Sequence, residues 1–174
     1  TTRLAECLLS AFKGTLVIDA DGLNTLANNP ELLERDRKCR VILTPHPGEM
    51  ARLAGVCVAD VQGARETCAK EFAKKTNTVV VLKGEKTVIS DGKTVLVNPT
   101  GNVGMATGGS GDVLSGIIAS LVGQGLSPLE SAACGAYLHG LAGDIAVKDK
   151  TEFGLIAGDL IEYLPRAFQA VLNG

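Results

Sequence analysis

A glycine-rich run that ends in an acidic residue offers the clearest chemistry in this 174-residue chain. It reads G-M-A-T-G-G-S-G-D, from Gly104 to Asp112, and leads directly into the amphipathic stretch V-L-S-G-I-I-A-S-L-V. Glycines let successive N–H groups converge on phosphate oxygens, and the start of a helix adds its positive end. The run holds four glycines between Gly104 and Gly111, which is more than a turn needs. This pattern predicts a phosphate site at a helix start, with Asp112 at or near the N-cap.

A second interpretation of this run stays open. Aspartate is among the favoured N-cap residues, so Asp112 could be only a cap and the glycines only a turn. In either case a helix must follow, because apolar residues recur at helical spacing. These residues are Val113, Leu114, Ile117, Ile118, Leu121 and Val122.

Three further polar segments each follow a short apolar run that is typical of a buried parallel strand. Open parallel sheets bind their ligands at the carboxyl ends of the strands, so we expect these segments to meet near the glycine run. The apolar runs are 15–20, 41–44 and 78–82, and the polar segments are D-A-D-G-L-N (19–24), T-P-H-P-G-E (44–49) and K-G-E-K-T (83–87).

Each of these segments also has a purely structural interpretation. Asp19 and Asp21 could cap a helix, His46 could be an exposed loop residue, Glu49 could be a first-turn acid, and Lys83 could simply end a strand. Together, however, they meet the needs of phosphoryl transfer. That reaction uses an anion cradle, positive charge near the transferred group, a metal held by carboxylates, and a base beside the attacking hydroxyl.

The remaining sequence predicts the elements that position these segments. Helical spacing is found at the very start of the chain and over 60–76, and strands alternating with helices indicate an α/β sandwich. Two alternating runs joined by Asp91-Gly92 predict an antiparallel hairpin over 87–97 at one sheet edge. Ser127-Pro128-Leu129-Glu130 predicts a capping box that starts a helix to about Lys148. His139 lies in the middle of this helix among apolar residues, so we interpret it as structural. A last amphipathic helix is expected over 158–172.

Composition excludes several classes of protein. A net charge of −2, a pI near 5.7 and the lack of a dense basic run argue against nucleic acid or an anionic membrane as partner. The five cysteines form no C-x-x-C pair, so neither a disulfide framework nor a zinc site is indicated. No apolar stretch approaches the ~20 residues of a membrane span. We therefore expect one soluble domain, 1–174, in the cytoplasm, with reduced cysteines.

The four segments give the chain a clear family resemblance. It resembles the carboxyl-terminal portion of the NAD(P)H-hydrate dehydratase family, within the ribokinase-like superfamily. The resemblance implies a three-layer α/β/α sandwich with a mostly parallel sheet and an antiparallel edge hairpin. The motifs that carry it are V-I-D-A-D-G-L-N, L-T-P-H-P-G-E, V-L-K-G-E-K-T and G-N-V-G-M-A-T-G-G-S-G-D-V-L-S-G, in that order.

The resemblance also implies a reaction, in which the S epimer of hydrated NADH or NADPH loses water at the expense of an adenine nucleotide. Asp112 would be the catalytic base, and G-G-S-G-D resembles the ADP-using branch more than the ATP-using one. Mg²⁺ would be held by Glu49 and, more weakly, by Asp19. The substrate would contact His46, Pro47, Gly48, Glu49 and Asp112. The nucleotide would contact Lys83, Gly84, Glu85, Lys86, Thr87, Asn102, Val103, Gly104, Met105, Ala106, Thr107, Gly108, Gly109, Ser110 and Gly111.

Two other functions remain open on the sequence, a ribokinase-like small-molecule kinase and a non-catalytic nucleotide-binding fragment. Relatives carry roughly another hundred residues before the point where this chain starts, a domain-sized difference. Because the chain opens inside or just before a helix without an initiating methionine, we expect a piece of a longer protein, truncated at the N-terminus. A homo-oligomer and an epimerase domain fused upstream are also expected.

Overall fold

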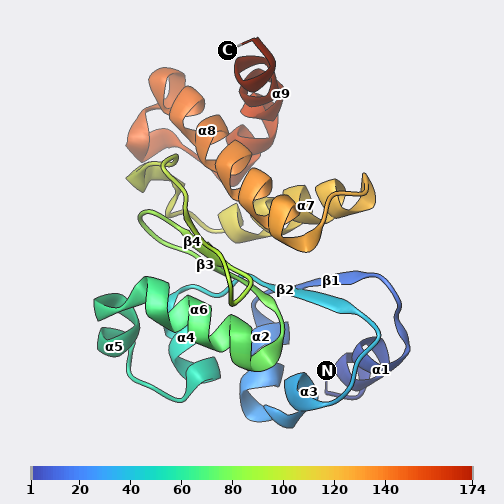
Figure 1. Ribbon diagram of the computed structural model, residues 1–174. Helices are drawn as coiled ribbons and strands as arrows, with labels where there is room; N and C mark the ends of the chain where they lie inside the picture. Colours follow the sequence, from blue (N-terminus) through green and yellow to red (C-terminus); the bar gives the residue numbers. More distant parts are fainter. Residues whose placement is uncertain (1, 174) are drawn as a thin grey trace.

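A five-stranded sheet forms the middle layer of the computed structural model, which describes residues 2–173 (Figure 1). The strands lie side by side in chain order, and the first three run parallel. The last two form an antiparallel hairpin at one edge, as predicted. The strands are β1 (Thr15–Ile18), β2 (Arg40–Leu43), β3 (Val79–Leu82), β4 (Val88–Ser90) and β5 (Val95–Val97).

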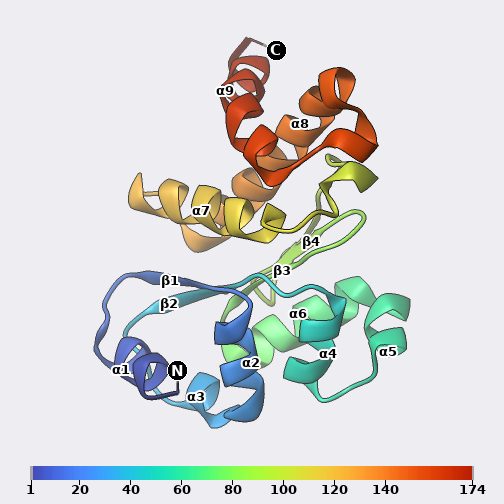
Figure 2. The same ribbon diagram turned by 180° about the vertical axis from the view of Figure 1, so that it is seen from behind.

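Helices cover both faces of this sheet, which confirms the three-layer sandwich (Figure 2). One face carries α1 (Thr2–Ala11), α2 (Asp21–Asn28), α3 (Glu31–Glu34), α4 (Pro47–Ala54), α5 (Val58–Gly63) and α6 (Arg65–Thr76). The other carries the 3₁₀ turn η1 (Val103–Met105), α7 (Ser110–Gly123), α8 (Pro128–Gly154) and, packed against α8, α9 (Ala157–Asn173). Within residues 2–173, no helix combines the length and the apolar character that a membrane crossing requires.

The central strand β3 shows why the sheet needs helices on both sides. Its sequence V-V-V-L is buried throughout, and successive side chains of a strand point to opposite faces. Val81 packs in one apolar cluster with Ile118 of α7, whereas Leu82 packs in another with Met50 of α4. A continuous apolar strand therefore ties the two helical layers together.

Two predicted helices differ in detail from the observed ones. A single helix over 60–76 is wrong, because the chain breaks at Ala64 (φ −144°, ψ 49°) between α5 and α6. The helix predicted from Ser127 is confirmed with its capping box, in which Glu130 N donates to Ser127 Oγ and Ser127 N to Glu130 Oε2. It continues past Lys148 until Thr151, whose φ of 63° interrupts it.

Candidate active site

The glycine run opens α7, but Asp112 is not its N-cap. The cap is Gly109, whose φ of 87° lies in the left-handed region that favours glycine, and Asp112 is the third helical residue. No side chain caps this helix, and Ser110 N donates to Thr107 O. Within residues 2–173, the next two amides, those of Gly111 and Asp112, have no backbone partner and remain available to an anion. The Asp112 side chain is exposed, and no hydrogen bond or ion pair within residues 2–173 engages its carboxylate. A carboxylate in this position is free to accept a proton from a bound ligand.

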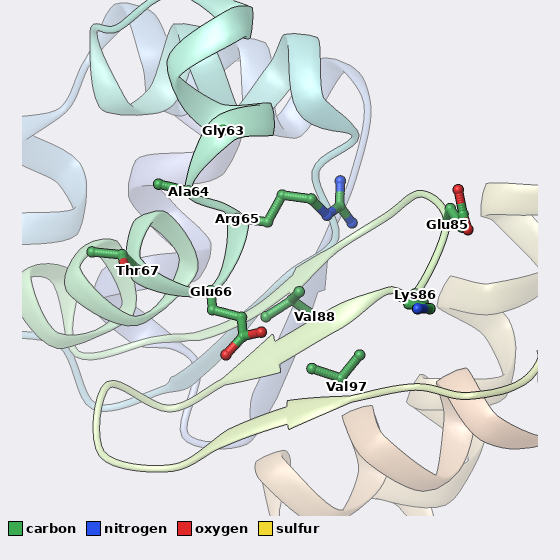
Figure 3. A pocket seen from close by; sticks show the side chains of 9 residues that line it. All are labelled: Gly63, Ala64, Arg65, Glu66, Thr67, Glu85, Lys86, Val88 and Val97. Carbon is green, nitrogen blue, oxygen red and sulfur yellow. The ribbon is translucent and has the colours of Figure 1, made fainter.

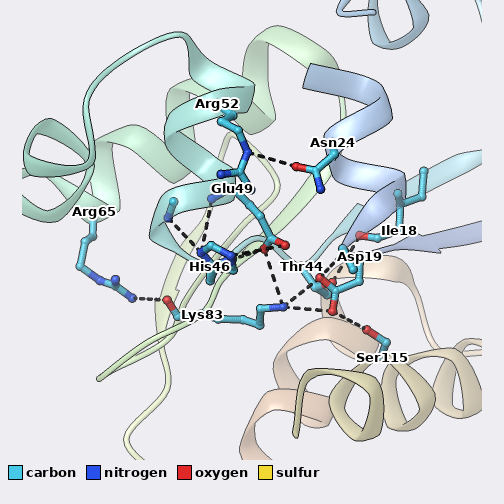
Figure 4. A network of polar contacts seen from close by, with 12 residues as sticks. Ile18, Asp19, Asn24, Thr44, His46, Glu49, Arg52, Arg65, Lys83 and Ser115 are labelled. Atoms are coloured by element: carbon cyan, nitrogen blue, oxygen red, sulfur yellow. Dashed lines mark hydrogen bonds and ion pairs between the residues drawn. The ribbon is translucent and has the colours of Figure 1, made fainter. Parts of the chain in front are cut away.

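An ion pair at the ends of β1 and β3 lies beside this helix start (Figure 4). Lys83 Nζ is 2.8 Å from Asp19 Oδ1 and 3.0 Å from Asp19 Oδ2, and both side chains are largely buried. Asp19 therefore does not cap α2, whose N-cap is Ala20. The two parallel strands bring together residues that are 64 positions apart in the sequence.

Two residues of α7 join the helix to this pair. Ser115 Oγ donates to Asp19 Oδ2 at 3.3 Å. A Cβ placed on Gly111 would lie 3.2 Å from Lys83 Nζ, which shows how closely the first turn approaches the ammonium. Asp112 and Ser115 share one helical face because they are three residues apart. That spacing is the sequence signal that could have identified Ser115, which sequence reasoning missed.

His46 and Glu49, at the end of β2, form the capping box of α4. His46 Nδ1 accepts from Gly48 N at 3.0 Å and from Glu49 N at 3.4 Å, and His46 N donates to Glu49 Oε2 at 2.8 Å. His46 is half-exposed, whereas Glu49 is buried. His46 therefore keeps an accessible ring edge while its Nδ1 stabilises the helix start.

Asp19 and Glu49 do not enclose a metal on their own. Lys83 Nζ lies 4.0 Å from Glu49 Oε2 as well as against Asp19, so the ammonium already compensates both carboxylates. No group of three or more potential histidine, cysteine or acidic ligands occurs within residues 2–173. These residues do not fit a magnesium ion caged by the protein.

The structure divides the predicted nucleotide segment K-G-E-K-T between two places. Lys83 points toward α7, whereas Glu85 and Lys86 line a cavity of about 570 Å³ that also borders the α5–α6 junction (Figure 3). Arg65 holds the turn from this side by donating to Leu82 O at 3.0 Å. Burial lowers the pKa of its guanidinium. Arg65 was missed because no local spacing links it to a segment 17 residues away.

His139 has the structural role that the sequence predicts. Its ring is buried, and Nε2 lies 3.0 Å from Ser110 O at the first residue of α7. Burial lowers the pKa of His139 to about 4, so the ring is neutral near pH 7 and Nε2–H donates to this carbonyl. The histidine thus anchors the start of α7 to α8.

Comparison with known proteins shows the family to which this chain belongs. The family model described as NAD(P)H-hydrate dehydratase matches residues 1–166. The chain belongs to this family. An ADP-dependent (S)-NAD(P)H-hydrate dehydratase from Neisseria meningitidis is 46% identical over 161 residues, which are 90% of this chain and 54% of the relative. A bifunctional NAD(P)H-hydrate repair enzyme, Nnr, from Moorella thermoacetica is 50% identical over 167 residues, or 95% of this chain and 31% of the relative.

A solved dehydratase has the same fold. The ADP/ATP-dependent NAD(P)H-hydrate dehydratase from Bacillus subtilis, co-crystallised with ATP/Mg²⁺ and soaked with CoA, superposes with a TM-score of 0.83 at 35% identity. The match covers 94% of this chain and 58% of that one. The chain therefore spans about a third to somewhat over half of the length of these relatives.

Proposed function

We propose that this chain forms the nucleotide-using part of an enzyme that dehydrates the S epimer of hydrated NADH or NADPH. The observation that carries the proposal is the unengaged Asp112 carboxylate, placed in the uncapped first turn of α7 beside the Asp19–Lys83 pair. The names of the similar dehydratases support this choice of reaction.

The proposed reaction has two steps that balance in atoms and charge. In the first, Asp112 accepts the proton of the ring hydroxyl as its oxygen attacks the terminal phosphoryl group of ADP, and AMP leaves. In the second, the bond between the ring carbon and the ester oxygen breaks and inorganic phosphate leaves, while the neighbouring ring carbon loses a proton to solvent, which restores the double bond. Phosphorylation thereby turns a poor leaving group into a good one.

We propose that backbone amides of the loop 102–111 hold the phosphates, with Lys83 supplying positive charge. The uncapped amides at the start of α7 support this assignment. Mg²⁺ generally binds through phosphates with one or two carboxylates, so we propose that it enters on the nucleotide, next to Glu49. His46, Pro47 and Gly48 are proposed to face the substrate.

The test is an assay of the full-length natural protein with hydrated NADH and either ADP or ATP. Equal amounts of NADH and inorganic phosphate are expected, with AMP as the second product from ADP. A small-molecule kinase, the alternative, would instead accumulate a phosphorylated substrate without releasing phosphate. Nucleotide binding without any turnover would leave only the non-catalytic function.

We further propose that residues 1–174 form one domain of a cytoplasmic protein, which in nature also contains a fused epimerase domain and assembles as a homo-oligomer. The bifunctional name of the Moorella relative supports the fusion. Exposed apolar side chains support self-association, those of Leu4 and Leu8 on α1 and of Phe12 directly after it. Light scattering of the purified protein would test the assembly by giving a mass above that of one chain.

A further inference from the structure

The segment that connects β5 to α7 packs along one face of helix α8. Asn98 Nδ2 donates to Ala136 O at 3.1 Å, and Thr100 Oγ1 donates to Tyr137 O at 2.9 Å. These contacts fix the beginning of the segment against the first half of the helix. Both bonds run from a side chain of the segment to a backbone carbonyl of α8.

Two glycines let the segment approach the helix more closely farther along the same face. A Cβ on Gly140 would collide with Thr100, and one on Gly143 would collide with the thioether of Met105. The helix surface is therefore shaped to receive this particular stretch of chain. Met105 belongs to the 3₁₀ turn η1, so the fit extends into the glycine loop.

Asp144 is the one charged side chain of α8 that binds this segment within the described part of the chain. Its Oδ2 accepts from Gly101 N and its Oδ1 from Asn102 Nδ2, both at 2.9 Å. Asn102 Oδ1 in turn accepts from Gly104 N at 3.1 Å. The carboxylate thus fixes Asn102, and Asn102 fixes the first glycine of the loop. Hydrogen bonds to an ionised acceptor are roughly twice as strong as neutral ones.

We propose that Asp144 is a positioning residue for nucleotide binding, which acts through Asn102 on the loop 101–105. The inference rests on the proposed function, since it takes this loop as part of the nucleotide site. A carboxylate near bound phosphates is otherwise unfavourable, because like charges repel. Here each oxygen accepts from one donor of the loop, so the charge holds the loop in place instead of facing the anion unpaired.

Two alanine variants of the full-length natural protein separate positioning from general stability. Asp144→Ala removes both contacts to the loop. Asp149→Ala is the matched control, because Asp149 lies on the same helix and also accepts two hydrogen bonds, in its case from the side chains of Tyr163 and Arg166. We expect Asp144→Ala to raise the Kd for ADP at least tenfold, and Asp149→Ala to leave it within twofold of the unchanged protein, with both measured by calorimetric titration.

Exchanging the side chains of Asp144 and Asn102 provides a second test. If Asp144 contributed only to overall stability, this exchange would not restore the affinity for ADP. Asn102→Asp alone places two carboxylates together and should weaken ADP binding. Adding Asp144→Asn restores one donor and one acceptor at the contact, so the double variant should regain most of the affinity. In steady-state assays the losses should appear mainly in the KM for the nucleotide rather than in kcat.

The outcomes distinguish this inference from the function on which it rests. If the unchanged protein binds ADP and Asp144→Ala binds it equally well, the positioning role is overturned and the proposed function stands. A swap that restores nothing also counts against the inference. If the unchanged protein binds no adenine nucleotide, the proposed function is overturned, and this inference with it.

Discussion

Asp112 differs from the other carboxylates of the site because it has no partner among the described residues. Asp19 is bound to Lys83 and Ser115, and Glu49 is bound to the backbone of His46. A proton acceptor must be free to meet its ligand, which supports the proposal that Asp112 is the general base.

Replacing Asp112 with asparagine should abolish turnover while leaving nucleotide affinity almost unchanged. The variant keeps the shape of the side chain but removes the base, which typically contributes ~10²–10⁴-fold to the rate. Phosphate release and calorimetric titration with ADP, both on the full-length natural protein, measure the two effects. Retention of more than a tenth of the rate would mean that Asp112 is not the base.

Two variants of His46 can distinguish its role as the cap of α4 from a role in binding the substrate. His46→Ala should lower the free energy of unfolding by about 1 kcal/mol, because it removes the acceptor for two α4 amides. His46→Asn should stay within about 0.5 kcal/mol of the unchanged protein, since asparagine caps well. Denaturant melts measure both values. If substrate affinity falls in the asparagine variant despite its normal stability, the ring contacts the substrate directly.

Sequence reasoning found the residues of the site that carry local signals and missed those that carry none. Asp112 and Lys83 stand beside glycines at the start or end of an element, where turn and strand patterns mark them. Asp144 reaches donors 42 and 43 residues away, and nothing in its own surroundings indicates the contact. Such residues become visible only when the packing of α8 is known.

At the scale of secondary-structure elements, short apolar runs located the strands and capping motifs located the helix starts. The break between α5 and α6 was not predictable, because Ala64 is neither glycine nor proline and favours helices by itself. The exact cap of α7 was not predictable for a related reason, although Asp112 lies near the cap as predicted. Aspartate is the better cap by side chain, but the backbone there adopts a left-handed φ that favours Gly109.

The hydrogen bond from His139 of α8 to Ser110 O of α7 should make the free energy of unfolding depend on pH. The pKa of His139 is about 4 in the folded chain, below its ordinary value of 6.5, so its contribution is complete above pH 6.5 and is lost as pH falls through 4. At about 1.4 kcal/mol per pKa unit, the full loss is roughly 3 kcal/mol. Denaturant melts between pH 7 and pH 4 should show this loss in the unchanged protein and a flatter profile in His139→Gln. Parallel profiles would contradict it.

At the scale of the whole molecule, the sequence predicted the layers but not what joins them. Parallel strands with helical connections restrict the fold to few arrangements, and the Asp91-Gly92 turn marked the edge hairpin. The long-range bonds from Arg65 to the end of β3 and from Asp144 to the loop depend on how those layers meet.

Nucleotide binding should stabilise the whole fold, because the site draws on β1, β3 and α7 together. A ligand at a hundredfold excess over its Kd adds ~2.7 kcal/mol, which for a chain of this length raises Tm by roughly 5 to 10 °C. A thermal-shift series with ADP, AMP and ATP measures this increase, with inorganic phosphate at the same concentration as the control. An unchanged Tm with all three nucleotides would contradict a nucleotide site.

The attachment of the glycine loop to α8 also has a consequence for biosynthesis. The chain is made from its N-terminus, so the strands and the loop leave the ribosome before the helix that shapes the loop. Until residue 144 has emerged, Gly101 and Asn102 lack the carboxylate that holds them. On the proposed role of Asp144, a nascent chain gains its affinity for a nucleotide only as the C-terminal helices dock. A nascent chain arrested before Asp144 should accordingly fail to retain a labelled adenine nucleotide.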